Sequence, residues 1–134
     1  MRLRLAKIVA AGGALTWAAT TAPGQEEAPT VPSGISLTLQ EVLLDTQVSG
    51  GALVRFRYVA PAVQADGFAA VEADFPALCT QQVLPWAATQ PTPIARTVIS
   101  MASAEVEFGV ASPDVIQFFE QFQLQKDACI WEGF

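Results

Sequence analysis

Apolar and polar residues alternate most regularly over residues 52–60, ALVRFRYVA. A period of two is typical of a β-strand that buries one face and exposes the other. The apolar face carries Val54, Phe56 and Tyr58, and the polar face carries Arg55 and Arg57. The pattern therefore predicts a half-buried strand whose arginine face is solvated.

The preceding segment, residues 35–45 with the sequence ISLTLQEVLLD, alternates in two phases. Its first apolar residues share one face, and the phase then shifts, which a β-bulge near Gln40 and Glu41 would explain. A helix starting at Thr38, with Glu41 completing a capping box, is the alternative. The turn signal Ser-Gly-Gly at 49–51 favours the strand, which would pair with the next strand as a hairpin.

One main helix is predicted in the middle of the chain. Residues 68–73, FAAVEA, indicate a short strand, after which Asp74 has the character of a helix N-cap. The helix then covers about 75–84 and carries Cys79. It ends where a loop with three prolines begins, residues 85–93.

Strands return in the last third of the chain. Residues 96–101 and 105–109 alternate as strands do. Segment 115–124 then carries apolar residues on one face, and Glu120 interrupts that face. The apolar members of the face are Ile116, Phe118, Phe122 and Leu124.

The chain closes on a predicted strand, ACIWEGF at 128–134, which follows a turn at 125–127. Cys129 and Trp131 share one face of that strand. The elements combine into an α+β fold, a mostly antiparallel sheet with one main helix packed on it in two layers. We expect Trp131 to pack beside that helix.

The first residues have the pattern of an export signal. Residues 1–7, MRLRLAK, are basic, and the next fifteen or so are uncharged and apolar or small. The prediction is a signal peptide at 1–24, cleaved before Gln25, and a periplasmic or secreted protein with no stable membrane anchor afterwards. Residues 25–34 are expected to form a flexible tail, and 35–134 a single domain.

Two cysteines, Cys79 and Cys129, are the whole cysteine content of the chain. An exported protein with an even number of cysteines is expected to pair them, and the bond would join the helix to the last strand. Two separately buried thiols are the alternative. A redox role is disfavoured because no Cys-x-x-Cys motif is present.

Charge and composition exclude several functions. Cleavage at residue 24 would leave 13 acidic residues against four basic ones, which disfavours nucleic-acid binding. The chain has no histidine, so Ser-His and Cys-His catalysis and histidine-containing zinc sites are excluded. Glycine-rich nucleotide motifs are also missing. We therefore assign no catalytic residue, no metal ligand and no cofactor.

Short motifs in a fixed order carry a resemblance to a known family. They are RFRYVAP (55–61), DFPALC (74–79), VIS (98–100), EFG (107–109), QFFE (117–120) and CIWEGF (129–134). Over most of 35–134 the chain resembles small exported bacterial proteins classed only as a domain of unknown function. The resemblance implies an exported single domain with paired cysteines. Some relatives carry an acetolactate synthase label, which does not fit a short chain without room for a thiamine-diphosphate site.

Arg55 and Arg57 are the most suggestive polar pair. They could clamp a carboxylate or a phosphate. In an acidic protein they could equally pair with Glu105, Glu107 or Glu120 across strands.

A carboxylate pair formed by Glu120 with Glu132 or Glu107 would suit a hydrolase, although solvated carboxylates explain these residues more simply. Phe119 and Phe134 fall opposite the expected core, and if uncovered they would form an apolar partner site. The favoured function is a non-enzymatic interaction or accessory module with a protein partner in the periplasm. The alternatives are a small-molecule or anion-binding protein and a carboxylate-based hydrolase.

Overall fold

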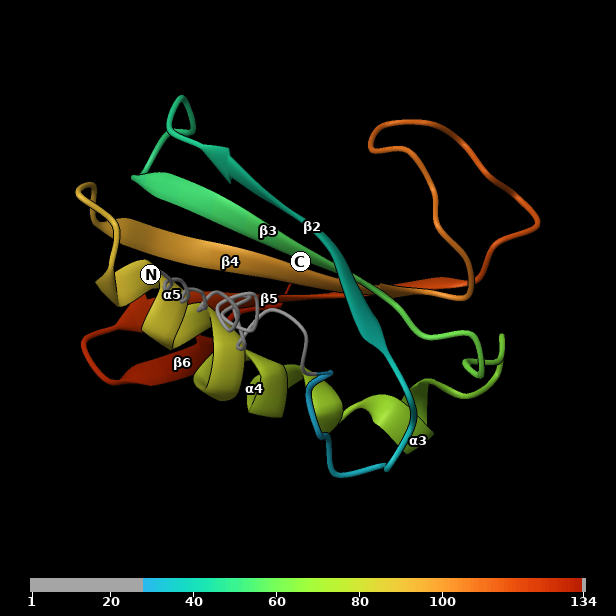
Figure 1. The fold of residues 1–134 in the computed structure, drawn as a ribbon. Coiled ribbons are helices and arrows are strands. Elements are labelled where there is room, and N and C mark those ends of the chain that lie inside the picture. The colour runs from blue at the N-terminus through green and yellow to red at the C-terminus, as the bar shows by residue number, and fades with distance from the viewer. Residues whose placement is uncertain (1–27, 134) are drawn as a thin grey trace, which may run out of the picture.

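Five strands form one sheet, and a helical segment covers one of its faces (Figure 1). The computed structural model describes residues 28–133. The strands lie side by side in sequence order, β2-β3-β4-β5-β6. Their bounds are β2 Thr38–Asp45, β3 Ala52–Val59, β4 Ile94–Ala102, β5 Gln117–Gln125 and β6 Ala128–Trp131. The predicted α+β fold with a mostly antiparallel sheet is confirmed.

The helices connect β3 to β4, which pair in parallel. Parallel neighbours cannot be joined by a tight turn, so the chain must cross one face of the sheet before the next strand begins. The crossover consists of α3 Phe68–Val71, α4 Asp74–Leu78, the π-helical turn η3 Cys79–Val83 and α5 Leu84–Ala88. This connection places the whole helical layer on one side of the sheet (Figure 1).

Two helix predictions are wrong in detail. The segment 68–73 forms α3, Phe68–Val71, and a turn rather than a strand, in keeping with the high helix propensity of its alanines. The helix also continues past Pro85 instead of ending there. Pro85 has no N–H to donate, and the widened turn before it, in which the Leu84 N–H bonds the Cys79 carbonyl, accommodates the proline.

Two strand predictions have different outcomes. The β2–β3 register shifts between Leu39 and Glu41, so the predicted strand with a bulge is confirmed and the helix alternative is wrong. Residues 105–109, by contrast, form no strand. The physical reason is topological, because β4 already pairs with β3 on one side and β5 on the other. The segment therefore cannot pair with β4, the strand that it follows.

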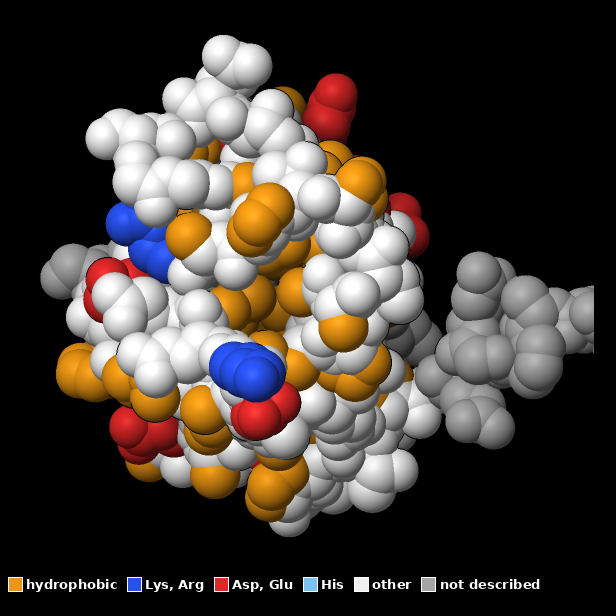
Figure 2. Space-filling view, turned by 90° about the vertical axis from the view of Figure 1, so that its left-hand side faces the viewer, with side chains coloured by type: hydrophobic (Ala, Val, Ile, Leu, Met, Phe, Trp, Pro, Cys, Tyr) orange, Lys and Arg blue, Asp and Glu red, His pale blue; other side chains and the backbone are white. Residues whose placement is uncertain are grey.

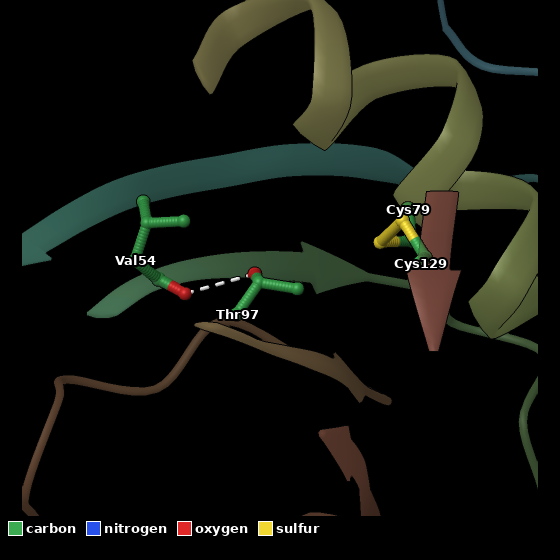
Figure 3. Close-up of a disulfide and its surroundings, with 4 residues drawn as sticks. All are labelled: Val54, Cys79, Thr97 and Cys129. Atoms are coloured by element: carbon green, nitrogen blue, oxygen red, sulfur yellow. Dashed lines mark hydrogen bonds between the residues drawn. A yellow bond between two sulfur atoms is a disulfide. The ribbon is translucent and has the colours of Figure 1, made fainter. Parts of the chain in front are cut away.

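The core lies between the helical layer and the inner face of the sheet. β3 contributes the apolar residues that its alternation predicts, and the Phe56 ring meets Trp86 edge-on at a centroid distance of 5.7 Å. Buried Thr97 is satisfied within the sheet, since its hydroxyl donates to the Val54 carbonyl at 2.9 Å (Figure 3). The largest buried apolar side chains are Leu37, Val54, Tyr58, Phe75, Leu78, Val83, Ile99, Met101 and Phe122.

The segment before β2 is held against the helices. Val31 is buried, and the Gln81 side chain donates to the Thr30 carbonyl at 2.9 Å. The Ser33 N–H and hydroxyl both donate to the fully buried Asp74 carboxylate, at 2.9 and 2.6 Å. The flexible-tail prediction therefore does not hold for 28–34. Asp74 binds this segment and is not the N-cap that the pattern predicted, because the N-cap position is Ala73.

The predicted disulfide is confirmed. Cys79 in η3 is bonded to Cys129 in β6, with the two Cα atoms 6.3 Å apart (Figure 3). Trp131 lies on the helix side of the sheet, as expected, where it lines a hollow together with Ala69 and Pro76, but it is 66% exposed because β6 is a short strand at the edge of the sheet. The Trp131 Nε1–H donates to Glu120 Oε1. No described helix has the length and apolar character needed to cross a membrane.

Candidate functional site

A groove with a volume of about 510 Å³ lies on the outer face of the sheet, the face away from the helices. Its floor comes from β3, β4 and β5, whose outward residues include Arg55, Val98 and Phe119. Its wall is the segment that connects β4 to β5, residues 103–116, here called the outer loop. In Figure 1 this loop extends away from the sheet on the side that the helices leave open.

The outer loop is closed at its base and turns sharply at its tip. The Ser103 N–H donates to the Ile116 carbonyl at 2.9 Å, and the Ile116 N–H donates to Ser103 Oγ at 3.0 Å. At the tip, the Val110 N–H donates to the Glu107 carbonyl at 3.2 Å. Gly109 has a φ of +81° in this turn, a conformation that favours glycine.

The β2 bulge holds the outer loop against the sheet. The extra residue, Gln40, donates through Nε2 to the Val106 carbonyl at 2.9 Å, and Arg57 Nη2 donates to the same oxygen at 3.0 Å. Arg57 Nη1 also pairs with Glu41 on β2. A bulge sets two residues of one strand against one of its partner, which lets Gln40 and Glu41 both act here.

Arg57 therefore differs from its prediction in two respects. The arginine face of β3 was expected to be solvated, yet Arg57 is only 7% exposed because the outer loop covers it. Its acidic partner is Glu41, rather than any of the acidic residues that the sequence suggested. With an ion pair and a carbonyl already bound, Arg57 has a structural role in fixing the groove wall.

Arg55 is only half-buried and keeps its hydrogen-bonding capacity. Within residues 28–133 it makes no ion pair and donates no side-chain hydrogen bond. Its guanidinium carbon lies 5.1 Å from the centre of the Phe108 ring, and that of Arg57 lies 5.5 Å from the same ring. A cation–π contact holds a guanidinium in place without using an N–H donor. Arg55 is therefore available to a ligand.

Exposed apolar side chains form the walls around Arg55. Phe119, predicted to point away from the core, lies on the outer face and is 48% exposed. Phe108 and Val110 at the loop tip are 53% and 50% exposed and also line the groove. The sequence analysis selects neither residue, since Phe108 falls in the strand predicted at 105–109 and Val110 follows it directly. Phe134, the other aromatic candidate, lies outside the described residues.

The candidate carboxylates do not converge. Glu120 points to the helix side of the sheet and accepts the Trp131 indole N–H. Glu132 accepts from the outward Gln121 side chain at 3.0 Å, and Glu107 lies on the outer loop. Neighbours along β5 point to opposite faces, so Glu120 cannot meet Glu132 across the sheet. Among residues 28–133, no three cysteine or acidic side chains lie close enough together to hold a metal ion.

Tyr58, next to Arg57 on β3, is a buried titratable group on the opposite face of the sheet. Burial raises the pKa of its phenol far above the ordinary value, and its hydroxyl donates to Gln82 Oε1 at 2.5 Å. Tyr58 points into the core and not into the groove. It is therefore a neutral core residue and offers the groove no acid or base.

Basic groups gather on the outer face. Arg55 and Arg57 project there from β3, and Arg96 projects there from β4, since it pairs with the outward Leu53 in the β3–β4 register. Arg96 donates to the Ser49 carbonyl at 2.8 Å and lies outside the groove. Figure 2 shows one end of the molecule, where apolar side chains surround a central hollow and basic side chains lie next to acidic ones.

Comparison with known proteins identifies a family without an assigned activity. A model described as a family of unknown function, DUF6497, matches residues 10–134. No curated protein and no solved structure matches the chain significantly.

Proposed function

We propose that this chain, which belongs to the DUF6497 family of unknown function, is a non-enzymatic binding module whose ligand occupies the groove under the outer loop. The observation that carries the proposal is the pairing of exposed apolar walls with an uncommitted guanidinium. Phe108, Phe119 and Val110 remain about half exposed around Arg55, which has no ion-pair partner in residues 28–133.

The size of the groove favours a small ligand over a broad protein interface. Ligand sites usually measure about 300–1,000 Å³, are mostly apolar and contain a few directed polar groups. The groove measures about 510 Å³ and has this composition. A protein partner usually covers about 800 Å² of each surface, much more than this concave site offers.

The frame of the groove is suited to binding rather than catalysis. The Val106 carbonyl is held by two donors, and the loop base is closed by two further hydrogen bonds. Such a preformed site loses little freedom when a ligand enters. A hydrolytic role has weaker support, since Glu107 is the one described carboxylate lining the groove and no second acid faces it.

Removing one apolar side chain that lines the groove should weaken binding of a neutral apolar probe. We expect Nile red to bind the native protein with one site, and Phe119→Ser to weaken that binding at least about tenfold, which corresponds to about 1.4 kcal/mol. Dye fluorescence during titration measures the affinity. Leu44→Ser is the matched control, because Leu44 is 43% exposed but lies outside the groove.

Equal weakening by both serine variants would mean that the dye responds to general surface hydrophobicity, and the proposal would fail. Thermal unfolding of each variant provides the structural check. Phe119 is half exposed, so its loss should change the melting temperature by only a few degrees.

We further propose that the protein acts in the periplasm or is secreted. The support is the basic and then apolar pattern of its first residues together with a disulfide, which persists in oxidising compartments. The signal-peptide prediction itself lies outside the described residues.

Expression in a bacterial host with the native N-terminal segment tests this location. The periplasmic fraction should contain a chain with a mass that begins near Gln25, whose cysteines react with an alkylating agent only after reduction. Recovery of the uncut chain in the cytoplasm, with cysteines that react at once, would contradict the proposal.

A further inference from the structure

We propose that the groove selects ligands that combine an apolar body with a single carboxylate, and that Arg55 binds the carboxylate. This inference rests on the proposed binding function and specifies its ligand class. It follows from how the two arginines of β3 are used, from the charge around the groove and from the composition of its walls.

The two arginines have divided roles. Arg57 forms an ion pair with Glu41 and donates a hydrogen bond to the Val106 carbonyl, so its donors already hold the outer loop. Arg55 lines the same groove with none of its side-chain donors used within residues 28–133. A guanidinium presents N–H groups in a planar fork that matches the two oxygens of a carboxylate. The contact with Phe108 restrains Arg55 before a ligand arrives.

The charge of the surroundings limits the ligand to one negative charge. Residues 28–133 contain four basic and eleven acidic side chains, so a polyanion is repelled at long range. Glu107 also lines the groove and would oppose a second negative group there. A single carboxylate next to Arg55 gains the local attraction at short range, where a half-buried pair is less screened than an exposed one.

The rest of the groove fits an apolar body. Leu53 and Val98 contribute aliphatic floor beside Arg55, exposed Phe119 adds an aromatic ring to the floor, and exposed Val110 lies in the wall. Burial of these surfaces against a hydrocarbon or aromatic ring supplies affinity in proportion to the apolar area covered. The carboxylate then sets the orientation, because it has one complementary guanidinium that is free.

Three eight-carbon probes separate charge from apolar character. We expect octanoate to bind the native protein about tenfold more tightly than octan-1-ol, and octylammonium to bind more weakly than either. Isothermal titration calorimetry at fixed ionic strength measures the three affinities. The Arg55→Gln variant should lose about tenfold in octanoate affinity and leave octan-1-ol affinity unchanged, so that the two ligands become similar.

Arg96→Gln is the matched control, since it removes the same charge from the same face outside the groove. It should change octanoate affinity less than about twofold, because Arg96 does not line the groove and salt screens its charge over the longer separation. Arg55→Lys keeps the charge but loses the planar fork, and we expect it to lose several-fold in octanoate affinity. The melting temperatures of all three variants should stay close to that of the native protein.

Two results would overturn the inference. One is octan-1-ol binding as tightly as octanoate, and the other is equal loss of octanoate affinity in Arg55→Gln and Arg96→Gln. Nile red binding that depends on Phe119, observed together with either result, would leave the binding function intact and reject only the carboxylate. Failure of both the dye and the eight-carbon probes would reject both proposals.

Discussion

Replacing both cysteines, Cys79→Ala with Cys129→Ala, is expected to lower the free energy of unfolding by about 4 kcal/mol. The bond spans 50 residues, and in the chain-entropy description a loop of that length restricts the unfolded chain by about this amount. A domain of this size has a total stability of about 5–15 kcal/mol. The disulfide is therefore expected to supply a large fraction of the stability.

The position of the bond increases its importance. β6 has four residues, lies at the edge of the sheet and leaves Ile130 and Trp131 exposed, so packing alone anchors it weakly. The link to the fully buried Cys79 fastens this strand to the helical layer. Without it, the last strand and the crossover should both open more readily.

Urea unfolding followed by circular dichroism measures the change. The native protein under a strong reductant is the matched control, since it loses the same bond without substitution. Both samples should show the same decrease in the urea midpoint. If the free energy of unfolding of the double variant falls by less than about 1 kcal/mol, the inner packing, and not the crosslink, holds the crossover.

Truncating Phe75 to alanine is the second large effect, with an expected loss of about 3–5 kcal/mol. Phe75 lies in α4 of the crossover and is completely buried, and its ring centroid lies 6.1 Å from that of Phe68. Its removal costs the transfer energy of an aromatic ring and leaves a cavity that a closely packed core fills only in part.

Phe108→Ala provides the comparison within the same chain. Phe108 is 53% exposed at the tip of the outer loop, so it should cost less than about 1 kcal/mol, mainly through the lost arginine contact. Denaturant unfolding of both variants gives the difference directly. Similar losses in the two variants would contradict the assigned core.

Local pattern was sufficient for several elements. The alternation of β3 identifies Val54, Phe56 and Tyr58 as inward residues, and they lie in the core. The phase change in β2 identifies the bulge, because a one-residue shift in a strand exchanges its faces. Cysteine count and the expected compartment identify the disulfide. The inward residues and the bulge depend only on neighbours in sequence. The disulfide depends on two cysteines that have no other cysteine to pair with.

Other elements depended on contacts that sequence spacing does not reveal. The segment 105–109 alternates as a strand would, yet both edges of β4 are occupied, so it became the wall of a groove. The parallel pairing of β3 with β4 also follows from the long crossover rather than from the strands themselves. Both outcomes are set by which edges are free, a property of the assembled sheet.

The candidate site shows the same division. The sequence selected Arg55, Arg57 and Phe119, and the structure places all three on one groove. The sequence did not reveal that Arg57 pairs with Glu41 while Arg55 has no ion-pair partner within residues 28–133. The bulge was the available signal, since an extra residue in a strand redirects side chains toward a nearby structure.

By itself, the sequence determined the fold class, the strand with an arginine face, the bulge, the disulfide pair and the exclusion of histidine chemistry. These follow from residue identity, periodicity and count, which are local quantities. Only the tertiary structure decided that the outer loop covers Arg57, that Arg55 and Arg57 have different roles and that the outer loop builds a groove. Such features arise where segments distant in sequence meet, and their burial and pairing depend on the geometry of the whole sheet.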